Sequence, residues 1–219
     1  MPSVIQLYHG SERIIEKPQW GLGKPHNDYG QGFYCTESEN LASEWACSSL
    51  SGGFVNRYAF DMTDLRVLRL NDPEYSILHW ITVLISYRLF RVRTPIAGHG
   101  IRFLQEHYSV NVNAYDVVIG YRADDSYYDF ADAFLNNGIT VEQLSQAMKL
   151  GKLGEQVVLK SPLAFERIRF EGYAQAEGTV WYPLRSQRNE KAQQAYLSLA
   201  SEVAEGTYLA DLIRGERRD

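Results

Sequence analysis

The sequence is poor in cysteine, with only Cys35 and Cys47 among its 219 residues. The two thiols form no Cys-x-x-Cys pair, and so small a number does not predict a disulfide framework. No positively charged and then apolar leader precedes Val4, so nothing predicts secretion. We therefore expect a protein of the reducing cytoplasm.

Long apolar runs are also missing. The longest such stretch, ILHWITVLISYRLF at residues 77–90, includes His79 and Arg88 and is shorter than the roughly 20 residues that a membrane-spanning helix needs. It predicts a buried helix and gives no indication of a membrane role.

Basic charge is scarce as well. The formal net charge is −5, which argues against a general nucleic-acid coat, because affinity for phosphate comes mainly from clustered Lys and Arg. The net charge does not exclude a local basic groove. The five histidines show no His-x-x-x-His or Cys–His spacing, so we expect no zinc site. Neither a Gly-x-Gly-x-x-Gly motif after a strand nor a Gly-Lys-Ser/Thr motif occurs, so Rossmann and P-loop nucleotide binding are not supported.

The remaining composition is typical of a globular protein, with 45% hydrophobic and 22% charged residues. Predicted strands and helices are mixed irregularly, which favours an α+β fold over a regular βαβ array. We predict a main domain at residues 1–175 and a helical extension at residues 176–219. From about Ser186 the sequence becomes polar and Ala-rich, with basic ends.

Apolar periodicity and turn signals predict the individual elements. Strands are expected at residues 3–11, 30–36, 54–62, 65–70, 115–120, 155–161 and 166–175. Helices are expected at residues 38–49, 74–93, 100–108, 129–138, 140–151, 187–206 and 208–219, with a short helical turn starting at Pro162. Gly138 fits the C′ position of one helix, and Thr140 with Gln143 forms a capping box for the next.

The first motif of interest is His-Gly-Ser at residues 9–11, at the end of the first predicted strand. His9 can hydrogen-bond a sugar hydroxyl there, and Gly10 lets a ligand approach the backbone closely. A lone histidine beside Tyr8 is more often structural, so this motif needs support from elsewhere in the chain.

That support is the Gly-Gln-Gly-Phe-Tyr-Cys-Thr motif at residues 30–36. Gly30 and Gly32 permit a tight bend near a ligand. Phe33 and Tyr34 alternate across a strand, so one ring can face the core and the other a cleft, and we expect Tyr34 to face the cleft. Simple hairpin packing is the alternative.

Together these motifs resemble the ADP-ribosyltransferase superfamily, in its His-Tyr-Glu branch, where a His-Gly-Ser strand and a Gly-x-Gly-hydrophobic-Tyr strand hold NAD. The chain is also similar to an uncharacterised bacterial family, DUF3990, that looks like that branch. From residue 5 to about residue 170, the segments that carry the resemblance are YHGS, DYGQGFYCT, WA, VNRYAFD, YDVVIGYRADD, GIT and EQVVLKSPLAFERIRF. The resemblance implies a split pair of small β-sheets with flanking helices and a cleft for NAD between them.

The resemblance also implies roles for individual residues. His9 would hydrogen-bond the 2′-hydroxyl of the nicotinamide-side ribose, and the backbone of Gly10 would hold the carboxamide. Tyr34 would stack on the nicotinamide ring. The other residues of the two motifs that would contact NAD are Ser11, Gly32 and Phe33.

The third catalytic position of the branch leads a later apolar strand, where this chain has Glu155 and Gln156. The bacterial family typically has Gln there, which favours Gln156, whereas the eukaryotic members have Glu, which would suit Glu155. Adjacent strand residues face opposite sides, so only one of the two can enter the cleft. An amide can position a ribose hydroxyl but cannot act as a general base near neutral pH.

The Asp124–Asp125 pair follows a buried strand. These aspartates can cap the next helix, or one of them, with Asp124 as our candidate, can bind a ribose hydroxyl or serve as a base. Arg122, two residues earlier, could neutralise a pyrophosphate.

We therefore expect an NAD-dependent enzyme that transfers ADP-ribose to a macromolecule, protein or nucleic acid. The resemblance implies a bacterial toxin or defence effector with a neutralising partner such as an antitoxin, and the segment after residue 186 offers a surface for it. The rival hypothesis is a non-catalytic module that binds NAD, ADP-ribose or a protein.

Overall fold

A computed structural model describes residues 3–123, 125–148, 154–201 and 205–216, so Asp124 lies outside the described residues. The strands are β1 (Val4–Ser11), β2 (Phe33–Cys35), β3 (Gly53–Asp61), β4 (Val67–Arg69), β5 (Val117–Tyr121), β6 (Glu155–Leu159) and β7 (Ile168–Ala176). The helices are α1 (Glu39–Ala46), α2 (Ile77–Tyr87), α3 (Pro95–His107), the 3₁₀ turn η1 (Val112–Ala114), α4 (Asp125–Leu135), α5 (Val141–Ala147), α6 (Pro162–Glu166), α7 (Gly178–Ser201) and α8 (Leu209–Glu216).

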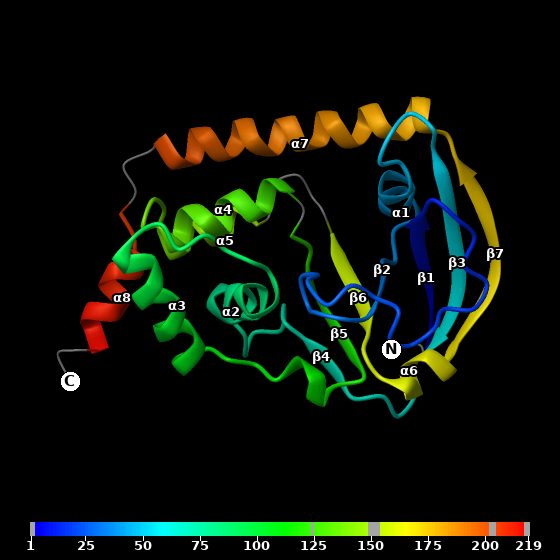
Figure 1. The fold of residues 1–219 in the computed structure, drawn as a ribbon, viewed down its shortest axis with the longest axis horizontal. Helices are drawn as coiled ribbons and strands as arrows, with labels where there is room; N and C mark the ends of the chain where they lie inside the picture. Colours follow the sequence, from blue (N-terminus) through cyan, green and yellow to red (C-terminus); the bar gives the residue numbers. More distant parts are fainter. Residues whose placement is uncertain (1–2, 124, 149–153, 202–204, 217–219) are drawn as a thin grey trace.

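The strands form two small sheets (Figure 1). The first has the order β1-β3-β7 and is antiparallel throughout. The second has the order β2-β6-β5-β4, in which only β4 and β5 run parallel. The expected α+β class with two small sheets is confirmed.

The second sheet is buried on both faces. Along β6, Val157 and Leu159 pack toward the first sheet, while Val158 packs toward the helices α2, α4 and α5. In β5, Val118 likewise faces the helices. This burial explains why both strands are almost entirely apolar.

A β-bridge joins the two sheets near their candidate motifs. The backbone N–H of Tyr8 donates to the oxygen of Thr36 at 2.8 Å, and the N–H of Thr36 donates back to Tyr8 at 2.9 Å. The middle of β1 and the residue that follows β2 are therefore held side by side.

The C-terminal helices pack against the rest of the chain. Helix α7 lies along one edge of the molecule (Figure 1) and contacts α1, α4 and α5. The ring of Tyr196 on α7 stacks on Phe130 with the centroids 4.3 Å apart. In α8, Leu209 is fully buried in the helical core. Helix α7 begins at Gly178, earlier than the polar sequence after Ser186 indicated.

Several predicted boundaries are wrong for identifiable reasons. Helix α2 ends at Tyr87 instead of continuing to residue 93, and α3 begins at Pro95, not near residue 100. Thr94 caps α3, and proline at the first helical position is a start signal that the glycines nearby obscured. After α4, Asn137 adopts the left-handed conformation with φ 63°, whereas Gly138 was expected to do so.

Local helix signals were otherwise read correctly. The capping box of Thr140 and Gln143 opens α5, and Pro162 opens α6. Ser38 is the N-cap of α1, and its hydroxyl accepts from the N–H of Leu41. None of the helices in the described ranges combines the length and apolarity needed to cross a bilayer.

Candidate functional site at the junction of the two sheets

His9 lies on the face of β1 that turns toward the second sheet, as Ile5 and Leu7 do. Its Nδ1 atom is 2.7 Å from the main-chain oxygen of Tyr34. A carbonyl oxygen only accepts, so Nδ1 carries the proton and Nε2 of the neutral ring keeps a lone pair. Burial lowers the pKa of His9, which favours this neutral form, although the bond to Tyr34 opposes the shift.

Phe33 packs directly on His9. The two ring centroids are 4.5 Å apart and their planes are tilted by 31°. The ring of Tyr58 meets Phe33 edge-on at 5.6 Å. Phe33 therefore faces the space between the sheets and fixes the His9 ring.

Tyr34, which we expected to face the cleft, points to the opposite face of β2, toward the helical core, and Phe33 is the ring that faces the space between the sheets. Its hydroxyl accepts from the N–H of Tyr29 at 3.0 Å and donates to the oxygen of Gly30 at 2.6 Å. Burial raises the pKa of this phenol. The hydroxyl thus closes the turn before β2, and the ring stays partly exposed.

Of the two alternatives on β6, the structure brings Gln156 to Tyr34. Tyr34 pairs with Val158, and Gln156 lies two residues from Val158 on the same face. Gln156 is buried and donates through Nε2 to Asp28 at 2.9 Å. Glu155 is exposed on the other face, where its carboxylate accepts from the side chain of Asn71.

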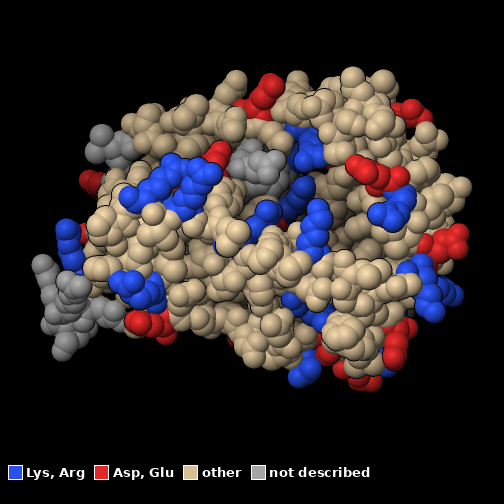
Figure 2. Space-filling model, in the orientation of Figure 1, with Lys and Arg blue, Asp and Glu red and all other residues tan. Residues whose placement is uncertain are grey.

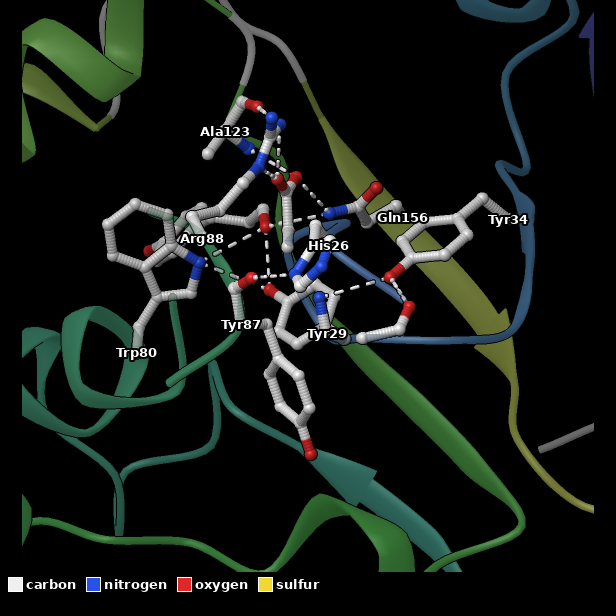
Figure 3. A network of polar contacts seen from close by, with 11 residues as sticks. His26, Tyr29, Tyr34, Trp80, Tyr87, Arg88, Ala123 and Gln156 are labelled. Carbon is white, nitrogen blue, oxygen red and sulfur yellow. Dashed lines mark hydrogen bonds and ion pairs between the residues drawn. The ribbon is translucent and has the colours of Figure 1, made fainter. Parts of the chain in front are cut away.

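Asp28 is the centre of a buried polar network that sequence reasoning missed (Figure 3). Its Oδ1 accepts from Arg88 at 2.8 Å, and its Oδ2 accepts from the N–H of Ala123 and from Gln156, both at 2.9 Å. The guanidinium NH2 of Arg88 is 2.7 Å from the same carboxylate. One residue therefore ties the turn before β2 to the ends of α2, β5 and β6.

Aromatic donors and acceptors extend this network. The Tyr29 hydroxyl donates to the oxygen of Tyr121 at 2.6 Å, and the Trp80 indole N–H lies 3.1 Å from both of these oxygens. Burial raises the pKa of Tyr29 well above its ordinary value, so the phenol stays neutral. These contacts fix the core beneath Gln156.

The sequence did hold weak signals for the network. Asp28 and Tyr29 directly precede Gly30 in the second motif, and Arg88 ends the most apolar helix of the chain. A charged residue at the end of a buried helix requires a partner. No local pattern, however, shows that the partner of Arg88 lies 60 residues away.

The small residues of the two motifs have packing roles. A Cβ on Gly10 would lie 1.9 Å from the oxygen of Ala42 on α1, so the glycine lets helix and strand approach. A Cβ on Gly32 would lie 2.6 Å from Cγ1 of Val158. Both contacts are with atoms of the protein. They give a steric reason for glycine at these two positions, which sequence reasoning did not identify.

Ser11 belongs to a turn organised by Asn56, a buried residue that sequence reasoning also missed. The Asn56 amide donates to the Ser11 hydroxyl at 3.1 Å and to the oxygen of His9 at 3.2 Å. Its Oδ1 accepts from the N–H of Ile15 at 2.8 Å. Asparagine is uncommon inside strands, and this is the signal that could have identified it.

Two cationic side chains lie next to the motifs. The guanidinium carbon of Arg122, which follows β5, is 4.7 Å from the ring centroid of Trp45 on α1. The ammonium of Lys160 donates to the main-chain oxygens of Tyr29 and Gln31 at 2.6 and 2.9 Å. Desolvation lowers the pKa of Lys160 to about 8.

Figure 2 shows Lys and Arg side chains around a hollow near the centre of one face, below α7. This hollow corresponds to the local basic groove that the net charge did not exclude. A separate shallow depression of about 420 Å³ lies at Ser49, Leu50, Ser51 and Tyr182, and none of the candidate site residues lines it.

These observations define an α+β protein in which His9 and Phe33 pack between the two small sheets, while Tyr34 and Gln156 share the other face of the second sheet. The chain matches the family model described as a protein of unknown function, DUF3990, over residues 5–170. It therefore belongs to this family. No curated protein and no solved structure matches the chain.

Proposed function

We propose that this protein is an NAD-dependent mono-ADP-ribosyltransferase that modifies a macromolecule. Two observations carry the proposal: the hydrogen bond from His9 to the Tyr34 backbone, which joins β1 to β2, and the shared face of Tyr34 and Gln156 on β2 and β6. These are the three positions to which the resemblance assigns the His-Tyr-Glu/Gln set.

The chemistry of these side chains suits a ribose. The neutral His9 ring offers Nε2 as an acceptor, and the Gln156 amide offers Oε1. Two neighbouring hydroxyls of a ribose could each donate a hydrogen bond to one of these two acceptors. The partly exposed ring of Tyr34 provides an aromatic surface for a planar ring such as nicotinamide.

The surrounding charge suits a dinucleotide. A pyrophosphate is stabilised by nearby guanidinium and ammonium groups, and Lys and Arg side chains gather around the hollow in Figure 2. Arg122 beside α1 is our candidate for this contact.

NAD supplies the ADP-ribosyl group when bound: the bond from ribose to nicotinamide breaks, and nicotinamide leaves with the electron pair. The acceptor then forms the new bond, and its proton passes to solvent or to a base on the acceptor. In this scheme His9 and Gln156 orient the ribose, and Tyr34 shields it from water. Gln156 takes no proton, because an amide is not a base near neutral pH.

The amide at position 156 also favours a second candidate function, a module that binds NAD or ADP-ribose without turnover. Such a module would use the same two acceptors for the ribose. Release of nicotinamide distinguishes the two candidates, because only the enzyme breaks the glycosidic bond.

We further propose that the enzyme acts as a toxin or defence effector with a neutralising protein partner. Helix α7 offers a contact surface for that partner, because Val180, Leu184 and Leu197 on it are exposed apolar residues. The acceptor is a macromolecule of either class.

The test is incubation of the purified protein with NAD labelled in the adenylate part and a total cell extract, followed by nuclease or protease. Label that survives nuclease but not protease identifies a protein acceptor, and the converse identifies a nucleic acid. His9→Gln is the matched control, and we expect it to lose labelling. If the protein binds NAD but releases no nicotinamide, it is the binding module. If it neither binds NAD nor releases nicotinamide, the proposal is refuted.

A further inference from the structure

We propose that Asp28 is a positioning residue that holds the Gln156 amide with its oxygen as a neutral acceptor for a ligand hydroxyl, and thereby requires an amide at position 156. This inference rests on the proposed function for the nature of the ligand. The contacts that support it are internal to the chain.

The carboxylate of Asp28 accepts three hydrogen bonds and forms an ion pair with Arg88. Arg88 donates to Oδ1 through Nε at 2.8 Å and approaches it with NH2 at 2.7 Å. Two further N–H groups, from Ala123 and Gln156, donate to Oδ2. An ionised carboxylate has about four acceptor positions. Three of them receive hydrogen bonds here, and the Arg88 ion pair adds a close cation. These contacts make Asp28 a structural partner of the Gln156 amide.

The orientation of the Gln156 amide follows from its neighbours. Its nitrogen is 2.9 Å from Oδ2 of Asp28 and 3.3 Å from the main-chain oxygen of Tyr121. Both neighbours only accept, so the group facing them must be the NH₂. The oxygen therefore points away from this hydrogen bond, as Figure 3 shows for the labelled Gln156 side chain. Among the described residues, no hydrogen bond to this oxygen is formed.

A carboxylate at position 156 would conflict with Asp28. Two ionised oxygens would then lie about 3 Å apart in a buried site with one guanidinium, and like charges so close raise the pKa of one partner. The other titratable and charged side chains in and around this network are His26, Tyr29, Tyr34, Tyr87, Arg88 and Lys160. The pKa values of the three tyrosines are raised, and Arg88 is the cation that pairs with the Asp28 carboxylate.

A protonated carboxyl group at this position would restore the pattern, because its O–H can donate to Asp28 while its C=O accepts from the ligand. Gln156→Glu therefore converts a fixed acceptor into a pH-dependent one. The sign of that dependence separates a neutral acceptor from a catalytic carboxylate.

The first test is the unfolding free energy of Gln156→Glu against pH, with Gln175→Glu on the exposed face of β7 as control. The folded-state pKa of the carboxyl group introduced at position 156 is expected to lie above its unfolded value of about 4.3. Between these two values the unfolded chain releases the proton first, so stability relative to wild type falls as pH rises. The control should show no such fall, and equal profiles for the two variants would overturn the inference.

The second test is NAD binding and nicotinamide release by Gln156→Glu between about pH 5 and pH 8. We expect near wild-type binding at the acid end and a loss of about tenfold or more toward the alkaline end. A gain with rising pH would show that the carboxylate is the competent form and would overturn the inference. If the wild type neither binds NAD nor releases nicotinamide while the stability profile is as expected, the proposed function fails and the role of Asp28 stands.

A double variant covers the case in which Gln156→Glu fails to fold. Asp28→Asn combined with Gln156→Glu returns the pair to one carboxylate, so the fall in stability with rising pH should disappear. This variant leaves the N–H of Ala123 without its acceptor, because the NH₂ group that replaces Oδ2 donates and does not accept. Persistence of the fall would contradict the coupling between the two positions.

Discussion

Nδ1 of His9 lies 2.7 Å from the main-chain oxygen of Tyr34, and this bond sets the tautomer of the imidazole at the junction of the two sheets. Because the proton is on Nδ1, the only ring atom that can accept from a ligand is Nε2. The backbone of β2 thus determines which ring nitrogen of His9, on β1, can accept a hydrogen bond from a ligand.

This relationship predicts a pH dependence. The folded-state pKa of His9 lies below its ordinary value of 6.5, mainly because of burial. Below about pH 6.5 the unfolded chain takes up the proton first, so stability falls as pH falls toward the folded pKa. The difference in unfolding free energy between wild type and His9→Gln should show this fall. His99→Gln, at an exposed position, is the control and should track the wild type.

The Tyr34 hydroxyl predicts a separate effect on stability. Tyr34→Phe leaves the N–H of Tyr29 and the oxygen of Gly30 without this partner. We expect a loss of about 1 to 3 kcal/mol in urea unfolding, because an unpaired buried group retains its desolvation cost. Tyr173→Phe removes a hydroxyl from an exposed ring and should change stability little. Equal losses for both variants would contradict a structural role for the Tyr34 hydroxyl.

The ion pair of Arg88 and Asp28 predicts a larger loss. The side chain of Asp28 is 6% exposed and that of Arg88 is 34% exposed, so Arg88→Met leaves a nearly buried carboxylate unpaired. We expect destabilisation of about 3 kcal/mol, at the low end for a buried pair because solvent screens part of it. Arg169→Met breaks a pair whose arginine is 79% exposed and should cost about 1 kcal/mol or less. Chemical unfolding of both variants tests the difference.

Local patterns predicted the strands of the site, whereas the preference for Gln156 over Glu155 came from the family resemblance. Alternation along β6 means that Glu155 and Gln156 cannot share a side, and the apolar run that follows defines which strand they lead. The motif at residues 30–36 likewise predicted that Phe33 and Tyr34 lie on a strand. It did not show that Phe33 packs on His9, because the relative placement of two sheets is a property of the whole core.

The buried network could not be predicted in the same way. Asp28 meets Arg88, Ala123 and Gln156, which are 60, 95 and 128 residues away. Hydrophobic periodicity carries information over a few turns or strand residues only. A charged residue within an apolar segment shows that a partner exists but does not identify it.

Gly10 predicts a steric effect next to His9. In Gly10→Ala the new Cβ would lie 1.9 Å from the oxygen of Ala42 and 2.6 Å from the nitrogen of Ala46, so α1 would have to move away from β1. We expect a loss of about 3 kcal/mol or more, since backbone atoms cannot yield as a flexible side chain does. Gly215→Ala meets no atom within 4 Å and is the control. Thermal unfolding of both variants checks the prediction, and a stable Gly10→Ala protein would contradict the packing of α1 on β1.

Lys160 predicts a gain in stability at alkaline pH. Desolvation lowers its pKa to about 8 in the folded protein, against 10.5 ordinarily. Between these values the unfolded chain binds more protons than the folded one, so this residue makes stability rise with pH, by up to about 1.4 kcal/mol per pH unit. The unfolding free energy of wild type minus that of Lys160→Met should therefore increase from about pH 8 to pH 10, while the tyrosines common to both proteins cancel. Lys191→Met, at an exposed position on α7, should give a flat difference, and a flat difference for Lys160→Met as well would mean that its ammonium is not desolvated by its contacts with Tyr29 and Gln31.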